Sequence, residues 1–208
     1  MRCAVCGADY AAYHVCRGAA PAEEVAPLEP APALRLAPWH YLREAAAIAR
    51  WDEAAIRRAA GDNNALLYGF VFWSVGVFLP ALRNVALAWL AGYAIPWWTL
   101  LGDLAKALAL MAFLMVGYFA ICHLIARVLF DGRGSYLGIL RAMLLGSLVL
   151  WLNVVPVVGP LVARLWWGIA ILLWVFEEVD AIERLQALAI VVGVPVALLL
   201  VGFFASLL

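Results

Sequence analysis

The chain has 208 residues, of which 68% are hydrophobic, and its 14 basic and 14 acidic residues give a formal net charge of zero. Soluble domains are usually about 45–50% apolar, so this composition excludes an ordinary water-soluble globule and indicates that lipid surrounds much of the chain. The lack of a basic stripe excludes a nucleic-acid-binding protein. We expect an all-α, polytopic membrane helix bundle with a small N-terminal head and a surface helix.

The first 18 residues are predicted to form a small head, which holds three of the four cysteines. Cys3 and Cys6 have the C-x-x-C-G spacing of half a zinc ribbon, in which two thiolates reach one tetrahedral ion. The second half is incomplete, because Tyr13 stands where the third cysteine is expected. We predict a structural zinc site with the ligands Cys3, Cys6, His14 and Cys16. The alternative is a decayed ribbon that holds no metal.

Residues 19–38 carry five prolines and many alanines, which predicts a semi-extended linker. Residues 39–61 are predicted to form one amphipathic helix, because Pro38 suits a helix start and Gly61 suits its end. The apolar positions follow helical spacing except at Asp52, and arginines supply the polar face. We expect this helix to lie on the cytoplasmic membrane surface. The alternative is a solvated connecting helix packed on the bundle.

Five apolar segments follow and predict a five-helix membrane domain over residues 65–208, because a spanning helix needs about 20 mostly apolar residues. The segments are residues 65–82, 104–130, 136–153, 161–176 and 185–208. Residues 85–95 are ambiguous, since they either prolong the first helix or lie at the interface as part of an aromatic belt.

The placement of arginines predicts the orientation in the membrane. Seven arginines precede the first span, and Arg127, Arg133 and Arg141 flank the loop after the second. The loop between the third and fourth spans carries no charge. The positive-inside rule then places the N-terminus in the cytoplasm and the C-terminus outside.

Two polar groups lie in or beside the second apolar segment. His123 follows Cys122 and precedes Arg127 by four residues; a metal or proton role is conceivable, and an interfacial histidine is the favoured interpretation. Asp103 and Lys106 have the spacing of an ion pair on one helix face. That pair either binds a substrate or, as we favour, marks the start of the helix.

Two further polar groups follow the third and fourth segments. The acidic residues after the fourth segment predict either a docking or cation site or a solvated loop; they are Glu177, Glu178, Asp180 and Glu183. The helix breakers after the third segment favour a tight hairpin over a re-entrant turn; they are Asn153, Pro156, Gly159 and Pro160.

Residues 130–208 contain, in order, the stretches FDGRGSYLGILRA, VVPVVGP, WWGIAILLWVFEEV and ALAIVVGVP. This ordered set resembles the Yip domain family of Ypt/Rab-interacting proteins and its bacterial relatives. The resemblance implies a five-helix, non-enzymatic membrane domain, and a zinc-ribbon head before it looks like a bacterial arrangement, hence a bacterial cytoplasmic membrane. The family-motif positions, expected to face a partner, are Gly134, Ser135, Tyr136, Pro156, Gly159, Glu177 and Glu178.

The chain shows none of the common hydrolase or nucleotide-binding motifs, so we do not expect an enzyme. We expect a membrane-organising or adaptor protein that captures a protein partner through its cytoplasmic head. Membrane lipids surround the bundle, and recurrent small residues would permit homo-oligomers. The alternative is a small transporter or channel, which needs polar groups near the middle of the membrane, and these apolar segments hold few.

Overall fold

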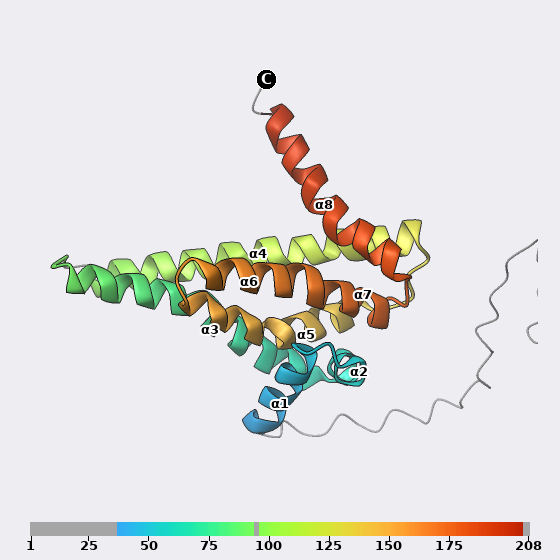
Figure 1. The fold of residues 1–208 in the computed structure, drawn as a ribbon, viewed down its shortest axis with the longest axis horizontal. Coiled ribbons are helices and arrows are strands. Elements are labelled where there is room, and N and C mark those ends of the chain that lie inside the picture. The colour runs from blue at the N-terminus through green and yellow to red at the C-terminus, as the bar shows by residue number, and fades with distance from the viewer. Residues whose placement is uncertain (1–36, 94–95, 206–208) are drawn as a thin grey trace, which may run out of the picture. The chain divides into compact units, whose positions relative to one another are not determined.

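The computed structural model describes residues 37–93 and 96–205, and this part of the chain is helical throughout, without a strand (Figure 1). In chain order the elements are α1 Pro38–Ile48, α2 Glu53–Gly61, α3 Asn63–Leu90, α4 Trp97–Leu129, α5 Tyr136–Gly146, the 3₁₀ helix η1 Ser147–Val154, α6 Val158–Leu165, the π-helix η2 Trp166–Ile171, α7 Leu172–Val179 and α8 Arg184–Ala205.

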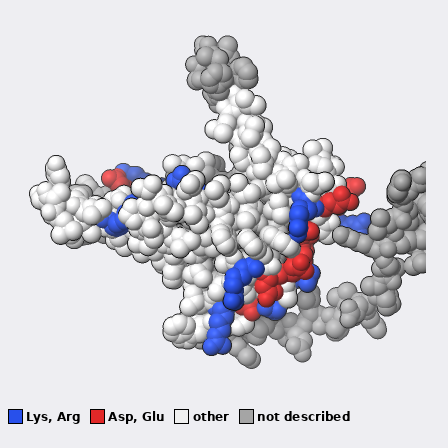
Figure 2. All heavy atoms as spheres, viewed as in Figure 1, with Lys and Arg blue, Asp and Glu red and all other residues white. Residues whose placement is uncertain are grey.

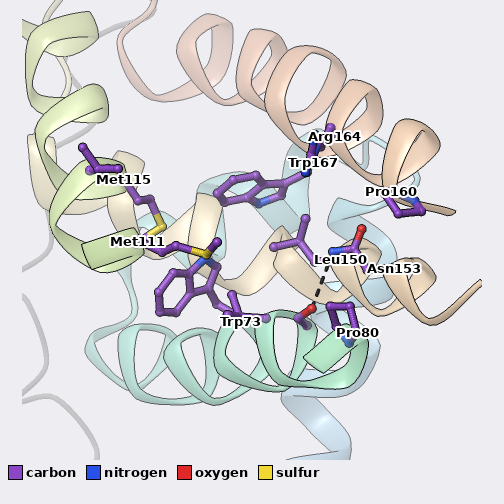
Figure 3. A pocket seen from close by; sticks show the side chains of 12 residues that line it. Trp73, Pro80, Met111, Met115, Leu150, Asn153, Pro160, Arg164 and Trp167 are labelled. Carbon is purple, nitrogen blue, oxygen red and sulfur yellow. Dashed lines mark hydrogen bonds between the residues drawn. The ribbon is translucent and has the colours of Figure 1, made fainter. Parts of the chain in front are cut away.

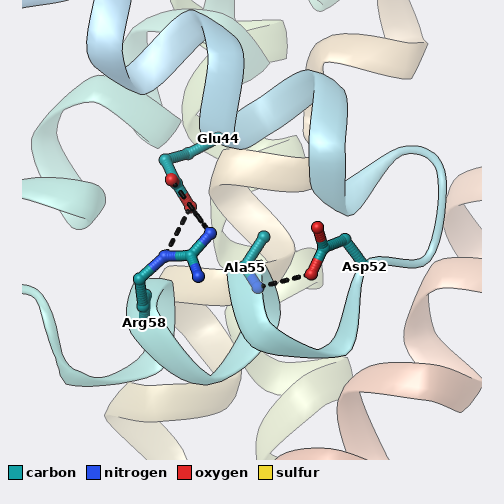
Figure 4. A network of polar contacts seen from close by, with 4 residues as sticks. All are labelled: Glu44, Asp52, Ala55 and Arg58. Atoms are coloured by element: carbon teal, nitrogen blue, oxygen red, sulfur yellow. Dashed lines mark hydrogen bonds and ion pairs between the residues drawn. The ribbon is translucent and has the colours of Figure 1, made fainter.

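Two helices, α1 and α2, stand where the sequence predicted one helix over residues 39–61. The chain turns between them at Trp51, whose φ is +63°. Asp52 then accepts a hydrogen bond from the Ala55 N–H at 3.0 Å (Figure 4). Asp52 is therefore the N-cap of α2. The prediction of one continuous helix was wrong because a capping residue was taken for a flaw in the apolar stripe.

Helices α1 and α2 pack against the bundle through their apolar faces. Ile48 and Ile56 are fully buried in the core. The Trp166 indole N–H donates to the Ala49 carbonyl at 2.9 Å, and its ring stacks on Trp51. The packed arrangement is the one that the alternative interpretation describes, and contact of this helix pair with the membrane surface stays a prediction.

In the part of the chain that the structure describes, four helical segments are long and apolar enough to cross a membrane: Asn63–Leu90, Trp98–Leu129, Tyr136–Val154 and Val158–Val179. The chain is thus built as a multi-pass helical membrane protein. The fifth predicted span corresponds to α8, a helix of 22 residues from Arg184 to Ala205. Four of the five predicted spans are therefore long and apolar enough to cross a membrane, and the fifth stays a prediction.

Helix α3 runs without interruption through the stretch that the sequence left ambiguous. It continues past Pro80 and ends at Leu90, so residues 85–90 prolong the first span. At about 1.5 Å per residue, its 28 residues measure about 42 Å, which exceeds a hydrocarbon core of about 30 Å. Arg83 on α3 donates to the carbonyls of Asn153 and Val154, each at 3.3 Å.

The third and fourth spans are irregular helices joined by a tight turn. After α5, the Ser147 hydroxyl donates to the Leu144 carbonyl at 2.5 Å where the 3₁₀ segment η1 begins. In the turn, Val157 has a φ of +64°. A Cβ at position 159 would overlap the Leu152 carbonyl, so Gly159 permits the close return of the chain.

Helix α5 lies at the centre of the described residues. In an 18-residue stretch of Tyr136–Val154, 61% of the residues are buried, against 17% in Trp98–Leu129. Helices α1, α2 and α3 all pack against α5. The contact with α3 depends on Gly69, because a Cβ there would lie 2.6 Å from the Leu145 backbone nitrogen.

Candidate functional site

Charged side chains gather over α1, α2 and the α7–α8 connection (Figure 2). We call this surface the charged end and define it by its ion-paired residues, which are Glu44, Glu53, Arg57, Arg58, Glu177, Glu178 and Arg184. It contains Glu177 and Glu178 from the acidic group that follows the fourth predicted span, and each of them pairs with an arginine. The arginines keep more than half of their side-chain surface exposed.

Ion pairs of the charged end join helices that are far apart in the sequence. Arg57 on α2 reaches Glu178 on α7 at 2.5 Å. Arg58 on α2 makes a forked contact with Glu44 on α1, with N···O distances of 3.1–3.3 Å (Figure 4). These contacts fix the relative positions of α1, α2 and α7 while leaving the arginines accessible to a partner.

A hydrogen bond from Tyr41 to Asp62 joins α1 to the start of α3 next to residues of the charged end. The Tyr41 hydroxyl donates to Asp62 Oδ2 at 2.6 Å, beside a cavity of 160 Å³ that Glu44 and Arg58 also line. Burial, followed by the hydrogen bond to Asp62, raises the pKa of Tyr41 to about 12. The phenol therefore stays protonated at neutral pH, and this tie between α1 and the start of α3 persists.

Beneath this surface lies a buried pair, His123 and Asp180. His123 Nδ1 on α4 lies 3.1 Å from Asp180 Oδ2, and the two residues are 9% and 0% exposed. From the sequence, His123 was interpreted as an interfacial histidine. Asp180 was interpreted as part of an acidic group that forms either a docking or cation site or a solvated loop. Both interpretations missed the pair, because the 57 residues between the partners hide it from any local pattern.

The loop before α5 closes over Asp180. The Arg133 N–H donates to the Asp180 carbonyl at 3.0 Å. A Cβ at position 134 would overlap the Val179 carbonyl and the Asp180 carboxylate, so the loop needs Gly134 to approach this closely. The loop therefore holds the end of α7 against α4 and shields the carboxylate from water.

Burial raises the pKa of Asp180 above its ordinary value, because a charged carboxylate loses its hydration there. The hydrogen bond and charge of His123, the Gly134 backbone N–H and the charge of Arg127 act in the opposite direction and do not cancel the effect of burial. Oδ1 of Asp180 has no hydrogen-bond partner among the described residues. The burial of both side chains leaves a substrate no access to the pair.

The structure brings five of the seven family-motif positions to the end of the bundle that carries these charges. Besides Gly134 and the two glutamates, Ser135 caps α5 by accepting from the Gly138 N–H at 3.0 Å. The Tyr136 hydroxyl donates to the Val116 carbonyl at 2.9 Å. Pro156 lies in the turn after η1, and Gly159 lies at the start of α6, both at the far end of α5–η1. The seven positions therefore do not form one site.

The predicted metal ligands Cys3, Cys6, His14 and Cys16 lie outside the described residues. Within residues 37–93 and 96–205, no group of three or more His, Cys, Asp or Glu side chains could hold a metal ion. Asp103 and Lys106 form the predicted helix-face ion pair at 3.5 Å, with both side chains exposed.

Comparison with protein-family models, with curated proteins and with solved structures finds no match to the chain. The resemblance to the Yip domain family therefore stays a prediction from the motifs of residues 130–208.

Proposed function

We propose that the chain is a non-enzymatic membrane adaptor whose bundle anchors two water-facing parts, the charged end and the N-terminal head, for capture of a protein partner. The charged end carries this proposal, since its ion-paired arginines gather on one surface and stay more than half exposed. Exposed ion pairs contribute only about 0–1 kcal/mol each to stability. Their concentration on one surface is thus better explained by recognition than by stability.

The distribution of polar groups disfavours the two other classes of function. Transporters place polar or charged groups near the middle of the membrane. Among the described residues, the buried polar side chains are His123, Ser147 and Asp180, and two of these form the pair beneath the charged end. An enzyme needs titratable groups that a substrate can reach, and that pair is closed off.

The motif resemblance supports the same role, and membership of the Yip domain family is part of the proposal. So is the orientation, with the charged end and the N-terminus in the cytoplasm of a bacterial cell and the C-terminus outside. The head of residues 1–35, with its predicted zinc site, precedes α1 in the chain and would add a second contact for the same partner.

Chemical crosslinking in native membranes, followed by purification of the full chain, tests the proposal. Deletion of residues 1–35 is the informative truncation, because a longer deletion would remove Ile48 and Ile56 from the core. A second variant, Arg57→Glu with Arg58→Glu, reverses two arginines of the charged end that are each more than half exposed. We expect a defined partner that the wild type captures and both variants lose, with membrane insertion unchanged.

The matched control is Asp103→Asn with Lys106→Gln, which neutralises exposed charges of α4 away from the charged end. This control should capture the partner as well as the wild type does. Equal capture by all variants would contradict the adaptor role. Solute flux through vesicles that contain the purified chain would instead establish the transporter alternative.

A further inference from the structure

A cavity of 340 Å³ lies between α3, α4, η1 and the helix formed by α6 and η2 (Figure 3). Its volume falls within the range of about 300–1,000 Å³ that is usual for ligand pockets. The walls are largely apolar and include Trp73, Val77, Met111, Met115, Leu150 and Trp167. The Trp167 ring is fixed there, because its indole N–H donates to the Met143 carbonyl at 2.9 Å.

Two irregular helices line this cavity. Leu150 and Asn153 belong to the 3₁₀ segment η1, and Trp167 belongs to the π-helix η2. Long 3₁₀ segments are uncommon, and π-helical turns within α-helices occur frequently at functional sites. Both irregularities therefore coincide with the cavity walls, in two of the four segments that are long enough to cross a membrane.

One end of the cavity is polar. The Asn153 amide lies 3.5 Å from the Gly76 carbonyl through Nδ2, while its Oδ1 is buried without a hydrogen-bond partner (Figure 3). Arg164 also lines the cavity and has no hydrogen bond or ion pair among the described residues. Arg164 belongs to α6, which begins directly after the turn that follows Asn153.

A second arginine reinforces the positive charge of this end. Arg83 donates to the carbonyls of Asn153 and Val154 and to the side chain of Asn84, all of which are neutral acceptors. Within the described residues, neither Arg83 nor Arg164 therefore meets a carboxylate. An unbalanced positive charge beside an apolar cavity complements a ligand that has an anionic head and a hydrocarbon tail.

We propose that this cavity holds one acyl chain of an anionic phospholipid from the surrounding bilayer. The phosphate contacts Arg164, which meets no carboxylate among the described residues. The apolar walls require the hydrocarbon chain, so a free phosphate would lack most of the contact. A zwitterionic lipid offers the same chain, but its own cation offsets the attraction to the two arginines.

Native mass spectrometry of the full-length chain, extracted from equimolar phosphatidylglycerol and phosphatidylcholine vesicles, tests the proposal. We expect retention of one phosphatidylglycerol with a preference of about fivefold over phosphatidylcholine, as charge-assisted contacts give. Arg164→Gln should remove this preference. Lys106→Gln, which removes an exposed cation outside the cavity, should leave it unchanged.

A second variant tests binding of the acyl chain separately from binding of the lipid head group. Val77→Phe fills part of the cavity without changing charge, and it should lower phosphatidylglycerol retention while the thermal unfolding midpoint stays near that of the wild type. Equal retention of both lipids by the wild type would overturn the proposal. So would unchanged retention in Arg164→Gln, an equal loss in Lys106→Gln, or displacement of the lipid by excess inorganic phosphate.

Discussion

Helices α5 and α4 are both apolar enough to belong to a membrane, yet different surroundings cover them. The third span, which contains α5, is mostly buried by protein, while the second span, within α4, leaves most of its surface exposed. The exposed large side chains of α4 include Phe113 at 75% and Val128 at 68%. Hydropathy reports that a segment avoids water, and only the packing shows whether protein or lipid replaces it.

The largest expected effect comes from removing a side chain that α2 contributes to the cover of α5. Ile56→Ala should lower the free energy of unfolding by about 3 kcal/mol, because it leaves a cavity at a fully buried position. Leu90→Ala, at a position that is 85% exposed, should change it by less than about 0.5 kcal/mol. Unfolding by SDS in mixed micelles measures both, and equal losses would mean that α2 does not pack on α5.

The next largest effects come from two glycines, one on α3 at the contact with α5 and one on α4, whose substitutions should change stability in opposite directions. Gly69→Ala should cost about 2 kcal/mol, because its Cβ meets the α5 backbone. Gly117→Ala on α4 has no atom within 4 Å of its Cβ and should gain up to about 1 kcal/mol from helix propensity. The same unfolding assay measures both variants. Destabilisation by Gly117→Ala would place an unseen partner against that face of α4.

The buried aspartate makes the stability of the charged end depend on pH. Because burial raises the folded-state pKa of Asp180, its contribution to stability is fully present below the unfolded pKa of about 3.9 and is lost as the pH rises through the folded value. Asp180→Asn cannot ionise. The variant should therefore gain stability relative to the wild type as the pH rises above about 4. A relative loss over that range would show that the pairing with His123 and Arg127 outweighs burial.

The smallest expected effect belongs to the exposed ion pairs. Arg58→Gln should lower the free energy of unfolding by less than about 1 kcal/mol, since Arg58 is more than half exposed. High salt should reduce the difference between this variant and the wild type, because it screens the interaction with Glu44. A loss above about 2 kcal/mol would show that this contact is structural rather than available for recognition.

The sequence predicted the helical class and four of the spans because these depend on local properties, namely apolar runs and helix ends. It did not predict the break at Asp52, since a polar residue within an apolar stripe is equally compatible with a cap and with a flaw. The burial of α5 also escaped prediction, because it depends on contacts with α1 and α2 from about 90 residues away.

The same limit applies to the candidate sites. Gly134 could be singled out by motif, but its role emerges only when the loop is seen against Val179 and Asp180. His123 and Asp180 come from different helices and meet through the fold. The cavity that Arg164 lines has no local signal apart from that one cation in an apolar segment.

The bond from Trp166 to Ala49 has a consequence for biogenesis. The tryptophan is synthesised 117 residues after the carbonyl that it binds, which at 5–20 residues per second corresponds to roughly 6–23 s of translation. During that interval the apolar faces of the first two helices have no completed docking site. The docking site of α1 and α2 is therefore complete only after the fourth span emerges from the ribosome.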